Sequence, residues 1–137
     1  AYRSLTLSWF QNSPLKKLLS KAAALDFQLV LTTDHGTLNV NKPSAVVADK
    51  ETSMNLRYKT GRSLTFEPKE VLDCENPNAF ALPSLSLSSR YIFAKEDYYF
   101  IYKNNYNHYV NFFNNTFQHG GVSLEEMIVP FVVLRPR

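Results

Sequence analysis

A carboxylate and an imidazole stand side by side at Asp34-His35, separated by two residues from the apolar run of residues 29–31 and directly before Gly36. A carboxylate oxygen and an imidazole nitrogen are both suitable ligands for Zn²⁺ or a similar ion. Adjacent side chains of a strand point to opposite faces, so the two act together only where the chain has left strand geometry, and Gly36 allows such a turn. The segment therefore predicts metal ligands. The alternative is that Asp34 caps a turn and His35 is an ordinary polar side chain.

His119 lies in a second segment of this kind, immediately before Gly120 and Gly121 and ahead of a predicted short helix. Paired glycines let the backbone approach a ligand closely or adopt positive φ. This placement is typical of a site residue, although a lone histidine is also commonly structural. His108, the third histidine, lies within an aromatic helical segment, where a functional role is the less favoured interpretation.

Three cations, Arg57, Lys59 and Arg62, fall within six residues of one another. Cations on a loop near a metal site can hold phosphate oxygens. The segment is therefore a candidate phosphate-binding site, and a solvated loop is an equally good interpretation.

The aromatic residues of segment 98–109 could stack on nucleic-acid bases, but alternating aromatic residues are also what a half-buried strand requires. The sequence contains no P-loop or dinucleotide fingerprint, and it gives no support for Ser/His/Asp or Cys/His catalysis. The metal-ligand segments therefore remain the strongest chemical signal.

Length and composition bound the class of protein. With 137 residues, of which 45% are hydrophobic and 20% charged, the chain fits one globular domain. No apolar run approaches the roughly 18–20 residues that a membrane span needs, and the N-terminus lacks a signal-peptide pattern. Cys74 is the single cysteine, which excludes an internal disulfide and a cysteine-based zinc site. These features favour a cytoplasmic protein that binds no membrane.

Residue patterns predict the elements that must position these residues in an α/β layered domain. Ser13-Pro14 is a typical helix start, with Ser13 as the cap and a helix to about Leu25. The apolar run 27–31 then predicts a strand that is central, parallel and buried on both faces. The other expected elements are a strand at 45–48, a basic loop at 49–63, helical turns at 67–72, an irregular segment at 74–89, an antiparallel β-hairpin of strands 90–94 and 98–102, a helix at 104–115, a capped helix at 123–127 and a strand at 131–134.

Five segments, in this order, resemble the PglZ domain of the alkaline phosphatase superfamily. They are WF-x-x-SP at 9–14, VLTTDHGT at 30–37, LRYKTGRS at 56–63, YIFAKEDYYFIYKNNYN at 91–107 and TFQHGGVSLEEMIVP at 116–130. The likeness extends to the PglZ output domain of PorX-type response regulators of Bacteroidetes and covers essentially the whole chain. It implies that residues 1–137 are a single domain fragment, the C-terminal part of an alkaline-phosphatase-like α/β/α domain.

The resemblance also implies a two-metal phosphohydrolase site. Asp34 and His35 match the pair that binds one zinc ion in the superfamily, and His119 matches the later ligand of the second ion. The family further uses a Thr or Ser nucleophile and additional Asp and His ligands, for which this sequence shows no counterpart. The resemblance therefore implies that these groups lie upstream, that zinc binding here is partial or absent, and that this chain alone is inactive.

The implied function is that of a zinc-dependent phosphodiesterase or phosphatase domain, the cytoplasmic output of a two-component regulator. Its expected partners are a phosphorylated small molecule or nucleotide, the upstream part of its own domain and, in a homodimer, a second copy. The alternatives are a non-catalytic interaction module that keeps the fold and a single-stranded nucleic-acid binder. The sequence leaves open phosphomonoesters, nucleotide diesters and cyclic oligonucleotides as substrates, and zinc or manganese as the metal.

Overall fold

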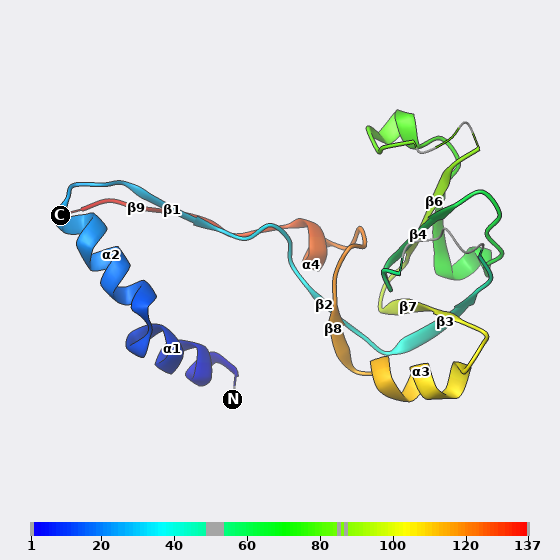
Figure 1. Ribbon diagram of the computed structural model, residues 1–137, viewed down its shortest axis with the longest axis horizontal. Helices are drawn as coiled ribbons and strands as arrows, with labels where there is room; N and C mark the ends of the chain where they lie inside the picture. Colours follow the sequence, from blue (N-terminus) through cyan, green and yellow to red (C-terminus); the bar gives the residue numbers. More distant parts are fainter. Residues whose placement is uncertain (1, 49–53, 85, 87, 137) are drawn as a thin grey trace. The chain divides into compact units, whose positions relative to one another are not determined.

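The computed structural model describes residues 2–48, 54–84, 86 and 88–136 of the chain (Figure 1). These residues form two compact units. Unit 1 combines the N-terminal segment up to Asp34 with the C-terminal segment from Pro130, and unit 2 comprises His35–Val129. Helices and small, mostly antiparallel sheets make up the structure, so the predicted α/β class is confirmed.

Unit 1 begins with two helices, α1 (Tyr2–Asn12) and α2 (Pro14–Ala24). Pro14 occupies the first turn of α2, where its missing N–H costs nothing, so the predicted helix start is confirmed. Ser13 has the extended backbone of an N-cap residue, with φ −87° and ψ 158°. Its hydroxyl, however, donates to the carbonyl oxygen of Phe10 at 3.1 Å. The predicted side-chain cap on α2 is therefore wrong, and the Ser13 hydroxyl closes the end of α1 instead.

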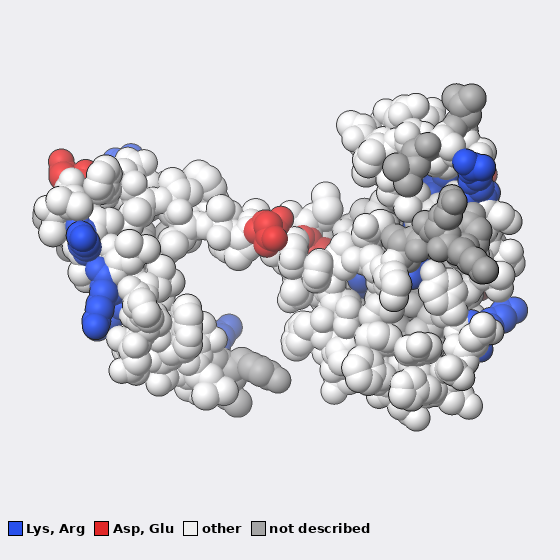
Figure 2. All heavy atoms as spheres, viewed as in Figure 1, with Lys and Arg blue, Asp and Glu red and all other residues white. Residues whose placement is uncertain are grey.

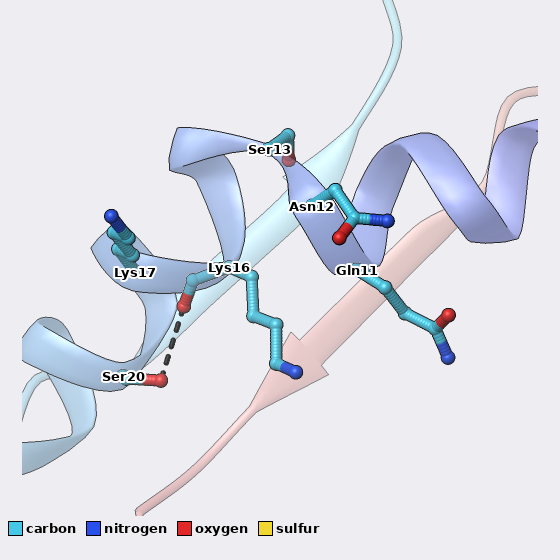
Figure 3. A pocket seen from close by; sticks show the side chains of 6 residues that line it. All are labelled: Gln11, Asn12, Ser13, Lys16, Lys17 and Ser20. Carbon is cyan, nitrogen blue, oxygen red and sulfur yellow. Dashed lines mark hydrogen bonds between the residues drawn. The ribbon is translucent and has the colours of Figure 1, made fainter.

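The junction of α1 and α2 carries a hollow of about 530 Å³ with polar and basic walls (Figure 3). Ser20 Oγ donates to the carbonyl oxygen of Lys16 at 3.1 Å, so its hydrogen bond is made within α2. The side chains of Lys16 and Lys17 point away from each other in Figure 3. Figure 2 shows several Lys and Arg side chains on the surface of unit 1. The two lysines at this hollow, Lys16 and Lys17, do not converge on one anion.

Strand β1 (Leu29–Thr32) pairs antiparallel with β9 (Phe131–Leu134), and Val30 lies opposite Val133 (Figure 1). Most of β1 and all of β9 are exposed. Both strands were predicted, but the expectation that the first is central, parallel and buried on both faces is wrong for the described residues. An apolar run specifies a strand that favours burial, but it does not specify which strand pairs with it.

The described residues of unit 2 form three small sheets and two α-helices (Figure 1). Strand β2 (Leu38–Val40) pairs antiparallel with β8 (Thr116–Gln118), and β3 (Lys42–Val46) pairs in parallel with β7 (Tyr98–Tyr102). Strands β4 (Tyr58–Gly61), β6 (Arg90–Ala94) and β5 (Val71–Cys74) form an antiparallel three-stranded sheet in that order. None of the helices in the described segments has the length and apolar character of a membrane span. The other elements are the 3-10 turns η1 (Pro68–Glu70) and η2 (Pro77–Phe80) and the helices α3 (Tyr106–Phe113) and α4 (Leu124–Met127).

The predicted hairpin is wrong, although both of its strands have the predicted bounds. Strand β6 pairs with β4 on one side and with β5 on the other. Both edges of β6 are therefore occupied, and β7 pairs in parallel with β3 instead. The turn between the two runs is present, but it carries the chain to a different sheet.

The segment predicted as a basic loop at 49–63 contains a strand, β4, and residues 49–53 of it lie outside the described residues. The loop prediction is wrong for the part that β4 occupies. Among the described residues β4 is an edge strand of its sheet and pairs with β6. The turn η1 agrees with the first part of the helical turns predicted at 67–72, whereas Val71 and Leu72 begin strand β5. The irregular character of most of 74–89 agrees with the prediction.

Two apolar clusters form the core of unit 2. The first is centred on Val46, Ile92 and Phe100, which come from three different strands. The second is formed by Val40, Tyr99 and Ile101. Helix α3 packs against it through Tyr106, Val110 and Phe113. Strands β2 and β7 therefore fix α3 and the start of β8, and through β8 they fix the position of the segment that carries His119.

Candidate metal centre

Two of the histidines singled out by the sequence lie together in unit 2. The imidazole rings of His35 and His119 stack, with 3.8 Å between their centroids and 8° between their planes. His35 precedes β2 and is half-buried, whereas His119 follows β8 and is exposed. Strands β2 and β8 pair antiparallel, with Leu38 opposite Gln118. This pairing brings the two histidines to the same end of a small sheet.

A hydrogen bond fixes the tautomer of His35. Its Nδ1 lies 2.9 Å from the carbonyl oxygen of Gly36. A carbonyl oxygen can only accept, so Nδ1 must carry the proton. In the neutral imidazole, Nε2 then holds the lone pair, and an Nδ1–H bonded to a backbone carbonyl is a common arrangement in metal-binding histidines. The backbone thus prepares His35 to bind an ion through Nε2.

Gly36 holds the His35 turn against α4. Its N–H donates to the carbonyl oxygen of Glu126 at 2.9 Å. A Cβ at this position would lie 1.9 Å from the carbonyl oxygen of Glu125, closer than any side chain can approach a backbone atom. The glycine is therefore required by the close approach of two backbone segments, in addition to the turn for which the sequence proposed it.

The His119 turn is also held by Glu126. The N–H of Gly121 donates to Oε1 of Glu126 at 2.9 Å. The N–H of Ser123, at the start of α4, donates to Oε2 at 3.3 Å. Gly120 has a φ of +101°, a conformation that residues with a Cβ rarely adopt. Gly120 thus turns the chain from His119 into α4, and the predicted positive φ of the glycine pair is confirmed at this residue.

Arg57 forms a buried, bidentate ion pair with Glu126. Nε donates to Oε1 and Nη2 to Oε2, each at 2.9 Å, and the side chains are 0% and 1% exposed. Nη1 donates to the carbonyl oxygen of Tyr98. Burial raises the pKa of Glu126, but the hydrogen bonds that its carboxylate accepts and the charge of Arg57 outweigh burial and hold this pKa below its usual value. Glu126 is therefore ionised at neutral pH.

Asn55 connects the His119 turn to the segment that enters β4. Its Nδ2 donates to the carbonyl oxygen of His119 at 3.2 Å, and its Oδ1 accepts from the backbone N–H of Arg57 at 2.7 Å. Sequence reasoning identified neither Asn55 nor Glu126 as a site residue. The spacing of Ser123 and Glu126 marked the glutamate only as a helix cap, and no local signal marks Asn55.

The structure separates the three cations that were predicted to bind phosphate. The guanidinium of Arg57 is buried against Glu126, so it is placed to support the turns and not to meet a substrate. Lys59 is also buried, its Nζ lies 4.7 Å from the centroid of the Tyr102 ring, and burial lowers its pKa to about 8. Arg62 is exposed, just beyond β4. Of the three, Arg62 alone has a position at the surface.

Asp34 and His108 are both exposed, the first in a bend of unit 1 and the second on a helix of unit 2. Asp34 is exposed in a bend beyond β1 and ends the first segment of unit 1. His108 is exposed on α3, where its ring lies 5.3 Å from that of Tyr109 and 6.4 Å from that of Phe112. Both of these ring contacts are with residues of its own helix.

The histidine pair has the donor chemistry of a metal site, but the arrangement of its rings limits how an ion can bind. Among the described residues, no three His, Cys, Asp or Glu side chains gather closely enough to hold one ion. A ligated ion lies near the plane of its imidazole, about 2.0–2.1 Å from the nitrogen. Two parallel rings stacked at 3.8 Å cannot both direct a nitrogen at the same ion. Their spacing instead fits two ions, one for each ring, because the ions of two-metal sites lie about 3.5–4 Å apart.

A comparison with protein families identifies the domain. The family model described as "BREX system PglZ alkaline phosphatase-like domain" matches residues 10–134, a range that includes both histidine turns and the Arg57–Glu126 pair. No curated protein matches the chain. The PglZ domain is a member of the alkaline phosphatase superfamily and has a phosphohydrolase-type fold. Because the match covers most of its length, the chain belongs to the PglZ family of alkaline phosphatase-like domains.

Proposed function

We propose that the chain forms part of a metal-dependent phosphohydrolase site in which His35 and His119 bind two different ions. The observation that carries the proposal is the stacking of the two imidazoles, although His35 begins the sequence of unit 2 and His119 lies near its end. A binding module has no need to bring two imidazoles together at the surface. Two stacked rings can, by contrast, hold a pair of ions about 3.5–4 Å apart, one ion for each ring.

The residues of this chain would bind the two ions and the phosphate group of the substrate. His35 offers Nε2, because the carbonyl oxygen of Gly36 holds the proton on Nδ1. Asp34, its neighbour in the sequence, is the proposed carboxylate ligand of the same ion. When bound, the two ions would supply Lewis-acid stabilisation of the charge on the phosphoryl group and on the attacking and leaving oxygens. Arg62 is the exposed cation that we propose for phosphate binding.

The three proposed ligands are fewer than two closed coordination spheres require. We propose that the remaining ligands and the nucleophile belong to polypeptide outside residues 1–137, so that the isolated chain binds zinc weakly and does not turn over. The proposed setting is the cytoplasmic output domain of a two-component response regulator of the PorX type, acting on a phosphate mono- or diester. The sequence segments that resemble such output domains support this setting.

A second candidate is a non-catalytic interaction module. The apolar side chains exposed on the β1–β9 ribbon favour it, since Val30 is 48% and Phe131 is 71% exposed. Such side chains are typical of a surface that a partner covers. The two candidates differ in their need for metal, because an interaction module would bind its partner equally well after chelation.

The test is hydrolysis by the intact protein in which this chain occurs, with zinc or manganese added after chelation. The substrates are bis(p-nitrophenyl) phosphate and p-nitrophenyl phosphate. We expect H35A and H119A each to lower kcat/KM by roughly a hundredfold or more, comparable to the loss of one preorganised group that stabilises the transition state. The matched control is H108A, which removes the exposed histidine of α3 and should leave the rate unchanged. Activity that survives both substitutions would overturn the proposal.

A further inference from the structure

The two histidine turns meet at one residue, Glu126. The turn that carries His35 is attached through the Gly36 N–H, which donates to the backbone carbonyl of Glu126 at 2.9 Å. The turn that carries His119 is attached through the Gly121 N–H, which donates to the side-chain Oε1 of Glu126 at 2.9 Å. The backbone of this glutamate thus holds one imidazole-bearing segment while its carboxylate holds the other.

Arg57 and Asn55 form further hydrogen bonds to the glutamate and to the turn that carries His119. The guanidinium engages both carboxylate oxygens of Glu126 at 2.9 Å, which leaves the carboxylate a single orientation. Asn55 accepts from the N–H of Arg57 at 2.7 Å and donates to the carbonyl oxygen of His119 at 3.2 Å. The arginine, the glutamate and the asparagine form one connected network, in which Arg57 and Glu126 are buried and Asn55 is half-buried.

We propose that Glu126, oriented by Arg57 and Asn55, is the positioning residue that sets the His35–His119 stack and hence the separation of the two ions. The metal-binding part of this inference rests on the proposed function, whereas the part that concerns the rings does not. Glu126 touches neither imidazole in the described contacts and acts through the turns that carry them. Ligand groups must be held to within about 0.5 Å to work together, which is the precision that such a network supplies.

Removing the carboxylate has a defined local consequence. Glu126→Ala leaves the N–H of Gly121 without its acceptor and leaves the buried guanidinium of Arg57 without its counter-charge. Both groups must then reach water or another acceptor, so the His119 turn moves away from α4. The His35 turn is attached through the backbone and stays in place. The rings therefore separate because only one of the two turns moves.

The direct test is the contact between the rings in the metal-free chain, measured by NMR as the nuclear Overhauser effect between imidazole protons of His35 and His119. The matched control is Glu96→Ala, which removes a carboxylate that is 71% exposed and pairs with Lys42, away from both turns. We expect the inter-ring effect in wild type and in E96A, and its loss in E126A. Retention of the effect in a folded E126A would overturn the proposal.

A second variant keeps the test decisive if E126A does not fold. Gly121→Ala preserves every charge, but its Cβ would lie 2.5 Å from Oε2 of Glu126 and 3.0 Å from Nε of Arg57, so the carboxylate must shift. Folding is judged from the amide resonances of the core residues Val46, Ile92 and Phe100. A folded G121A with an unchanged inter-ring contact would also overturn the proposal, and a weakened contact would support it.

Zinc affinity, measured by calorimetry on the intact protein, separates this inference from the proposed function. Loss of a group that orients metal ligands typically weakens binding by about 10–100-fold, and we expect a loss of this size in E126A and no change in E96A. If wild type shows the ring contact but binds no zinc, the proposed function fails and the positioning role stands. If wild type lacks the ring contact, the positioning role fails.

Discussion

His35 and His119 stack ring on ring at 3.8 Å, although they enter unit 2 near its two ends. Their strands, β2 and β8, pair antiparallel and place both side chains at one end of a small sheet. The near-parallel planes exclude convergence on one ion and fit one ion for each ring. The relationship therefore converts two separate sequence signals into one arrangement with specific chemical consequences.

Removal of one partner of the Arg57–Glu126 pair should strongly lower the stability of the protein. We expect E126A to lower the free energy of unfolding by about 3–5 kcal/mol, because a buried guanidinium loses its partner. The double variant R57M/E126L, which removes both charges, should cost less. Urea denaturation compares the variants. The exposed pair of Lys42 and Glu96 gives the reference, where E96A should change stability by about 0–1 kcal/mol. Equal costs for E126A and E96A would contradict the account.

The same pair predicts a dependence of stability on acid. The pKa of Glu126 is lowered in the folded state, so the folded protein binds fewer protons than the unfolded chain between the two pKa values. The contribution is fully present above the unfolded pKa of about 4.3 and is lost as pH falls through the folded pKa. Unfolding of wild type and E126Q should therefore differ most near pH 7, and the difference should shrink toward pH 3. A difference that grows in acid would refute this sign.

Lys59 predicts a change at alkaline pH. Burial lowers its pKa from 10.5 to about 8, so between these values the unfolded chain holds a proton that the folded protein has released. Stability of wild type relative to K59M should therefore rise from pH 7.5 to pH 10, by an amount on the order of 1–3 kcal/mol. Chemical denaturation at a series of pH values measures it. A wild-type protein that loses stability relative to K59M over this range would show that the ammonium is stabilised where it lies.

Gly36 should tolerate no side chain. Gly36→Ala places a Cβ 1.9 Å from the carbonyl oxygen of Glu125, so the His35 turn must move away from α4. We expect a loss of about 1–3 kcal/mol, typical of overpacking. The neighbouring Thr37 is exposed, and T37A is the control, with an expected change below about 0.5 kcal/mol. Thermal denaturation of both variants measures the difference. A G36A protein as stable as T37A would mean that the close backbone approach is absent.

In unit 2 the sequence predicted β6, β7, α3 and α4 but not β2, β4, β5 or β8, and it did not correctly predict which strands pair. The runs at 90–94 and 98–102 are strands with the predicted bounds because alternating aromatic and apolar residues specify extended structure. Their pairing depends on which edges are already occupied, and β6 has both edges taken by β4 and β5. The apolar run of β1 likewise specified a strand but not its antiparallel neighbour β9.

The residues of the candidate site were predictable where the residue type itself carries the chemistry. Histidines next to glycines stood out, and the structure brings His35 and His119 together. The supporting network was not predictable, because Arg57 and Glu126 meet only after β4 and α4 are in place. A cation in a polar segment indicates a surface loop, so the sequence predicts Arg57 as a phosphate ligand. Burial, which decides its role, is a property of the fold and not of the local sequence.

The most direct test of the central claim is the number of metal ions bound by the intact protein, measured by mass spectrometry of the elements after dialysis against zinc. The account predicts two ions per chain in wild type and in H108A. H35A and H119A should each lose one ion and keep the other, because the stacked rings serve different ions. A protein that binds no zinc, or in which H35A and H119A bind as much as H108A, would contradict the claim that this pair belongs to a two-metal site.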